Sequence, residues 1–187
     1  MIRRIFLLLT LALWAGPAVA QTVMRPDPPL DSARAAVRDA LLILRDSLNT
    51  IDGAAARLQR DFRQASGPSL VSRARVMHLA CSHSREVVPP TRRALLDAQI
   101  SEARRMRYRA ELVHEMDRLS KALARCELDF AAMSKPGEGE TVRGYGNDRA
   151  TKVQAALRRY EVALRSFLGA MGIKVMPIGS APNPAAG

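Results

Sequence analysis

Cysteine and histidine are the side chains of this sequence best suited to chemistry, and both are rare. The 187 residues include two cysteines, Cys81 and Cys126, and three histidines. His78 and Cys81 are three positions apart, so on a helix they would share a face and offer two ligands to a metal ion. His83 points to a different face, and a closed zinc site usually needs four ligands. The pattern therefore predicts no metal site and leaves the two cysteines available for a disulfide.

A Glu-x-x-His element over Glu111 to His114 is the second pattern with chemical potential. Di-iron bundles combine two such elements with glutamates from two further helices. This chain has one element, and its residues 30–66 contain no glutamate. We therefore interpret the match as chance and expect Glu111 and His114 on a solvated face. The sequence also lacks haem-attachment, phosphate-loop, dinucleotide and Ser-His-Asp patterns. It predicts no catalytic residue, no cofactor and no enzymatic activity.

Four stretches with apolar residues at alternating steps of three and four make up most of the chain. This period places the apolar side chains on one stripe of a helix, and we expect helices over about 30–66, 69–99, 101–134 and 147–172. The predicted fold is all-α, an antiparallel up-down four-helix bundle over 30–173. The stripes are Val37, Leu41, Leu44, Leu48, Ile51, Ala55, Leu58 and Phe62; Leu70, Ala74, Met77, Cys81, Ser84 and Val88; Leu112, Met116, Leu119, Leu123, Cys126, Phe130 and Met133; and Val153, Leu157, Tyr160, Leu164, Phe167 and Met171.

The position at which the second helix reverses decides whether the two cysteines can meet. Pro89 and Pro90 remove helical N–H donors, so they must break or kink this helix. A reversal at the prolines would leave Cys81 and Cys126 about 40 Å apart along the bundle axis, whereas a reversal near 100–101 reduces the mismatch to about 9 Å. We therefore predict a Cys81–Cys126 disulfide and a second helix that is kinked at the prolines and continues to residue 99. The alternative is a pair of buried free thiols.

The N-terminus has the pattern of a secretory signal peptide. An Arg-Arg pair at 3–4 precedes an apolar run over 5–14, and Ala-Val-Ala at 18–20 allows cleavage after Ala20. The apolar run would rise only about 15 Å as a helix, too little for a bilayer core of roughly 30 Å. We expect a periplasmic or secreted bacterial protein without a transmembrane span in its mature chain. Outside the bundle the sequence predicts a signal peptide over 1–20, a flexible leader over 21–29 and a disordered tail over 174–187.

A strong excess of basic residues indicates the class of partner. The formal net charge is +11, and loss of Arg3 and Arg4 with the signal peptide leaves +9. Export argues against nucleic acid, and no basic run is interleaved with several aromatic residues for base stacking. The expected partner is an anionic lipid, a polysaccharide or an envelope protein.

One basic cluster lies where the second predicted helix ends and the third begins. Arginines at the start of a helix oppose its dipole, and such a placement suggests an external anionic partner. The alternative is a solvated face with intrahelical pairs such as Arg107–Glu111. The candidate anion-binding residues are Arg92, Arg93, Arg104, Arg105, Arg107 and Arg109.

A glycine-rich segment over 134–146 is predicted as a loop that exceeds the usual roughly two to eight residues between bundle helices. Arg143 and Tyr145 are its candidate binding residues, and the alternative is a plain connector. Leu42 and Ile43 lie beside the first apolar stripe, where one of them could face a partner subunit. The sequence thus favours an exported, non-enzymatic bundle that binds an anionic envelope component or a protein partner through a basic surface. Its alternatives are a small-ligand or metal carrier that uses the bundle interior and a structural homo-oligomer.

Overall fold

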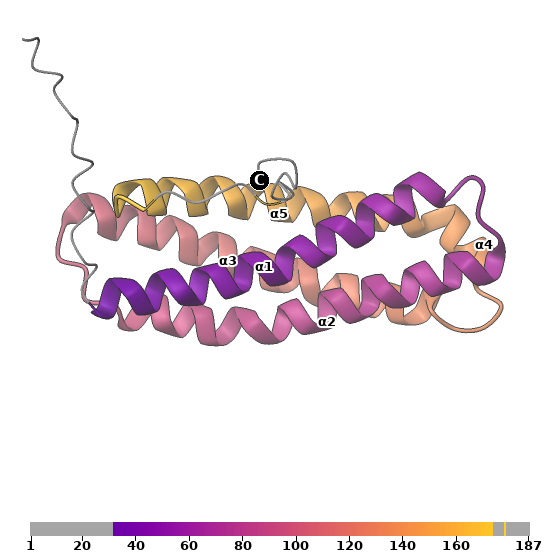
Figure 1. The fold of residues 1–187 in the computed structure, drawn as a ribbon, viewed down its shortest axis with the longest axis horizontal. Helices are drawn as coiled ribbons and strands as arrows, with labels where there is room; N and C mark the ends of the chain where they lie inside the picture. Colours follow the sequence, from indigo (N-terminus) through magenta and orange to yellow (C-terminus); the bar gives the residue numbers. More distant parts are fainter. Residues whose placement is uncertain (1–31, 174–177, 179–187) are drawn as a thin grey trace, which may run out of the picture.

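The computed structural model describes residues 32–173 and residue 178, and within these residues every regular element is helical (Figure 1). The predicted signal peptide and leader lie outside the described residues, as does the predicted tail apart from Ile178. No helix among the described residues is long and apolar enough to cross a membrane. The elements are α1 (Ser32–Asp61), α2 (Gly67–Asp97), α3 (Ala103–Met133), α4 (Gly139–Thr141), the π-helix η1 (Val142–Gly146) and α5 (Asn147–Ala170).

Four long helices surround one apolar core. α2 packs against α1 and α3, and α5 packs against α3 and α1, so each long helix has two neighbours. The predicted stripes form this core: every stripe residue is buried except Phe62, which is half-buried against it. Burial of one face per helix explains why no long helix needs to be stable alone. The prediction of an all-α helical bundle is confirmed.

The boundary between the first two helices differs from the prediction. The sequence predicts a helix over about 30–66, but α1 ends at Asp61, and Gly67 and Pro68, which follow the predicted range, begin α2. Ser66 is the N-cap, and its side chain accepts a hydrogen bond from the backbone N–H of Ser69 at 3.4 Å. Pro68 is the second residue of α2, in the first turn, where a backbone N–H has no intrahelical partner and the φ of proline is already helical.

The predicted loop over 134–146 is also wrong in most of its length. Only 134–138 forms a non-helical connection, and helical backbone then continues through α4 and η1 into α5, so Asn147 does not cap a new helix. Gly137 turns the chain at φ 90°. Gly139 lies so close to α2 that a Cβ atom there would be 2.5 Å from the Cα of Gly67. These glycines therefore serve a turn and a backbone contact, while the buried Val142 extends the apolar face of α5.

A disulfide joins Cys81 on α2 to Cys126 on α3, with the two Cα atoms 6.0 Å apart. The prediction of this bridge is confirmed, and neither cysteine is a free thiol. Pro89 and Pro90 lie inside α2, and the chain reverses after Asp97, beyond the prolines as predicted. The kink at the prolines stays a prediction. Both prolines are exposed, as are Arg85 and Glu86, whose carbonyl groups lose their helical donors at these positions.

Candidate anion-binding surfaces

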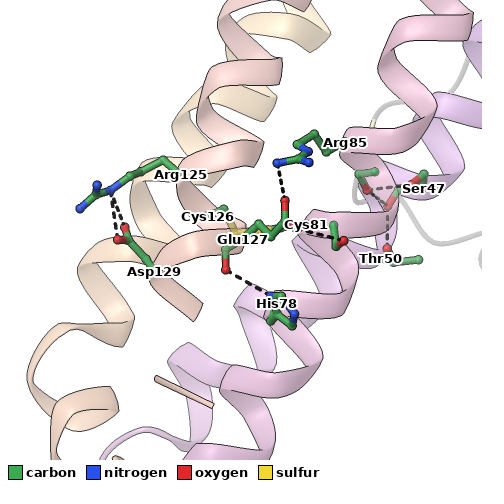
Figure 2. The surroundings of a disulfide bond; sticks show 11 residues. Ser47, Thr50, His78, Cys81, Arg85, Arg125, Cys126, Glu127 and Asp129 are labelled. Atoms are coloured by element: carbon green, nitrogen blue, oxygen red, sulfur yellow. Dashed lines mark hydrogen bonds and ion pairs between the residues drawn. A yellow bond between two sulfur atoms is a disulfide. The ribbon is translucent and has the colours of Figure 1, made fainter. Parts of the chain in front are cut away.

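The surroundings of the disulfide account for His78, the histidine that shares a helix face with Cys81. Its Nδ1 atom lies 3.2 Å from the backbone oxygen of Glu127, the residue after Cys126 (Figure 2). The ring therefore contacts α3 beside the disulfide. Among the described residues, no three His, Cys, Asp or Glu side chains are arranged to hold a metal ion.

Glu127 is a polar residue that the sequence analysis missed. Its carboxylate lies between α2 and α3, where it pairs with Arg85 at 2.8 Å and accepts a hydrogen bond from Ser82 at 3.3 Å (Figure 2). Ser82 and Arg85 follow Cys81 by one and four positions, so they lie on the helix face next to the disulfide. Once a Cys81–Cys126 bridge is predicted, that spacing is the signal that could have identified the cluster.

Two of the six candidate arginines bind backbone oxygens inside the protein. Arg109 donates to the oxygen of Ala98, the extended C-cap residue that follows α2, at 2.9 Å. Arg105 donates to the oxygen of Ala170, the last residue of α5, at 3.1 Å, and pairs with Glu102 at 2.9 Å. The last carbonyl groups of a helix lack intrahelical donors and carry partial negative charge. Arg105 therefore satisfies the end of α5, and Arg109 holds the connection that follows α2.

The other four candidates differ in how far they are already paired. Arg92 pairs with Asp117 at 2.9 Å, and Arg107 pairs with Glu111 at 3.2 Å, the intrahelical pair considered in the sequence analysis. Arg104 lies over the ring of Tyr108, 5.9 Å from its centre. Arg93 is exposed and has no ion-pair partner among the described residues. Only part of the predicted cluster thus remains available to an external anion.

Arg143 has a similar internal role at the opposite end of the bundle. It donates to the backbone oxygens of Phe62 at 3.1 Å and Ala65 at 3.0 Å, and its Nε atom pairs with Glu140 at 3.4 Å. Arg143 thereby joins η1 to the turn that follows α1. Tyr145, the second candidate of this segment, is 60% exposed, and its predicted binding role is still untested.

Unpaired basic residues gather at this same end, which we call the α1–α2 end. They are exposed and have no ion-pair partner within the described part of the chain, although Arg63 lies over the ring of Phe62. Glu138, in the nearby connection, has no ion-pair partner either and is half-buried. α4 lies against the start of α2, which places this connection at the α1–α2 end (Figure 1). The cations are Arg57, Arg60, Arg63, Arg75 and Lys135.

Three of the remaining predicted residues line two shallow grooves. Glu111 and His114 are both exposed, as expected, and line a groove of about 380 Å³ between α3 and α5. Ile43 is 62% exposed beside a groove of about 270 Å³ between α1 and α2, whereas Leu42 is half-buried. Ile43 is therefore the better placed of the two to meet a partner subunit.

Comparison with known proteins gives no functional assignment for this arrangement. No protein-family model, no characterised protein and no solved structure matches the chain.

Proposed function

We propose that this protein is an exported, non-enzymatic, up-and-down helical bundle that binds anionic lipid of the cell envelope. A signal peptide cleaved after Ala20 would deliver it to the periplasm or the exterior, where a disulfide can persist. The binding surface is the α1–α2 end, with Arg57, Arg60, Arg63, Arg75 and Lys135.

The observation that carries this proposal is the gathering of exposed cations without carboxylate partners. A carboxylate of the same protein that pairs with a guanidinium group cancels much of its positive electrostatic potential, as for Arg92 and Arg107 at the other end. Cations without a carboxylate partner keep more of their attraction for an external anion. Near an anionic membrane each Lys or Arg contributes about 1 kcal/mol, and the attraction falls off within one Debye length.

Sedimentation of the mature chain with vesicles tests the proposal. Vesicles that contain phosphatidylglycerol should bind the protein at about 0.01 M salt, where the Debye length is about 30 Å, and release it at about 1 M, where it is about 3 Å. Vesicles of phosphatidylcholine alone should bind weakly at both salt concentrations.

Two double variants with equal loss of charge locate the surface. Arg57→Gln with Arg60→Gln should lower the partition coefficient roughly 30-fold, from about 1 kcal/mol for each cation. Arg93→Gln with Arg104→Gln removes the same charge from the opposite end and should have little effect. Equal losses in both variants would contradict a localised surface, and no binding to either vesicle would refute the proposal. Binding to an anionic polysaccharide but not to vesicles would replace lipid by polysaccharide as the partner.

A homo-oligomer is the second candidate, because Ile43 is a large apolar side chain with 62% exposure beside an open groove. Light scattering of the wild type and of Ile43→Lys measures this directly. A dimer that dissociates in the variant supports the second candidate, and a wild-type monomer excludes it. A carrier that uses the bundle interior remains an untested alternative, and a featureless absorption spectrum with no bound metal would argue against it.

A further inference from the structure

An apolar groove of about 450 Å³ lies at the α1–α2 end, between the start of α2 and the connection that follows α3. Its volume falls within the roughly 300–1,000 Å³ that is typical of small-molecule sites. Glu140 also borders the groove, and its carboxylate is paired with Arg143. The other lining residues carry no polar side chain: Gly67, Pro68, Val71, Pro136, Gly137 and Gly139.

The backbone contact between two of these glycines forms the groove. Gly67 and Gly139 approach so closely that a Cβ atom on Gly139 would contact the backbone of Gly67 at 2.5 Å. This contact brings the first turn of α2 against α4. Pro68 and Pro136 contribute walls without an N–H donor, because a prolyl nitrogen carries no hydrogen. The result is a hydrocarbon surface open to solvent, next to a cluster of cations.

Two of the unpaired cations lie close in sequence to residues that line this groove. Arg75 follows the lining residue Val71 by four positions on α2, so the two lie on the same helix face. Lys135 immediately precedes the lining residue Pro136. Both cations are exposed, and neither has an ion-pair partner in the described residues. Apolar walls with basic residues beside them match a molecule that has a hydrocarbon chain and a negatively charged head.

We infer that the groove binds an acyl chain of an anionic lipid, with the phosphate head group next to Arg75 and Lys135. This inference rests on the proposed function and adds to it a specific contact. The cations of the α1–α2 end draw the protein to the lipid surface, and the groove then holds one chain. Attraction by charge alone would depend on the head group and not on the chain, whereas a groove makes the affinity depend on chain length.

Calorimetric titration with monomeric lyso-phosphatidylglycerol tests the groove without a membrane surface. The mature protein should bind this lipid and should not bind glycerophosphoglycerol, which is the same head group without a chain. Lyso-phosphatidylcholine of equal chain length should bind more weakly. Shortening the acyl chain by two methylenes should lower the affinity by up to about 15-fold, at about fourfold for each CH₂ removed from contact.

Substitutions distinguish the contribution of the apolar walls to lipid binding from that of the cations. Pro136→Asp places a carboxylate in the groove at an exposed connection and should abolish binding of the lyso-lipid. Arg75→Gln with Lys135→Gln should weaken binding by up to about fivefold for each exposed cation–phosphate pair, and should reduce the preference for phosphatidylglycerol over phosphatidylcholine heads. The matched control, Arg93→Gln with Arg104→Gln, should bind as the wild type does. Circular dichroism confirms that each variant is folded.

The outcomes distinguish this inference from the proposed function. If vesicles bind but lyso-lipid does not, or if Pro136→Asp binds lyso-lipid normally, the groove is not an acyl-chain site and the electrostatic proposal stands. If lyso-lipid binds with the expected chain dependence but anionic vesicles do not, the groove inference stands and the membrane-binding function fails. Equal affinity for the head group alone would also overturn the groove.

Discussion

Replacement of Arg143 by glutamine should destabilise the bundle, because this guanidinium group links two elements far apart in the sequence. It donates to the backbone oxygens of Phe62 and Ala65, in the turn between α1 and α2. Loss of the cation leaves two carbonyl groups and Glu140 without their partner. Arg143 is also a candidate binding residue from the sequence, so the substitution tests a structural role against a binding role.

The magnitude follows from the number of bonds and their exposure. Hydrogen bonds to charged groups contribute about 1.5–3 kcal/mol each. The side chain of Arg143 is 34% exposed, so water can replace part of the interaction, and we take a total loss of about 2–3 kcal/mol. At roughly 2–4 °C per kcal/mol for a chain of this size, the melting temperature should fall by about 5–10 °C. Arg143→Lys should lose about half as much, since an ammonium group cannot form the same fork of bonds.

Thermal and urea unfolding monitored by circular dichroism measure the loss. Arg158→Gln is the matched control, because Arg158 is an exposed residue of α5 with no ion-pair partner among the described residues. It should change stability by no more than about 0.5 kcal/mol. If Arg143→Gln is as stable as Arg158→Gln, the two bonds to the turn contribute nothing and the structural role is refuted.

The disulfide closes a loop between cysteines 45 positions apart in the sequence. Its reduction should therefore lower the free energy of unfolding by about 4 kcal/mol in the chain-entropy model. Urea titration with and without reductant measures this, and a shift below about 1 kcal/mol would contradict the model. Tyr160→Phe should raise stability by about 1 kcal/mol, because the buried hydroxyl has no hydrogen-bond partner among the described groups, and Tyr145→Phe serves as the exposed control. Burial raises the pKa of Tyr160, so above about pH 10 this hydroxyl ionises in the unfolded chain but not in the folded protein, and the free energy of unfolding falls. Tyr160→Phe should lack this part of the loss of stability at alkaline pH.

The long helices could be predicted because their apolar residues repeat at the helical period. The disulfide could be predicted because two independent constraints, helix length and export, agree on it. Stripe positions from Val37 to Met171 recur at the helical period, and burial of one face requires only that period. Only one of the two reversal points considered brought Cys81 and Cys126 within reach. That prediction therefore combined the axial rise of a helix with the chemistry of an exported protein.

The helix boundaries could not be predicted equally well, because glycine and proline have more than one use. Gly67 and Pro68 can end a helix or begin one, and the choice follows from Ser66, which caps α2. Over 134–146 the glycines suggested a loop, but Gly139 is required by a contact with a residue 72 positions earlier, namely Gly67. A local pattern contains no information about such a neighbour.

The basic cluster of the α2–α3 connection shows the same dependence on neighbouring helices. Arg105, in the first turn of α3, opposes the dipole of its own helix, which in isolation indicates an external anion, whereas Arg109 lies beyond that turn. In the structure Arg105 lies against the carbonyl end of α5, where a cation is favourable, and Arg109 binds the oxygen of Ala98, the extended residue that follows α2. A charge that is misplaced for one helix is thus well placed for the end of the next. The net charge of a bundle end therefore identifies a docking surface only after the cations that cap neighbouring helices have been set aside, and by that criterion the α1–α2 end is the stronger candidate.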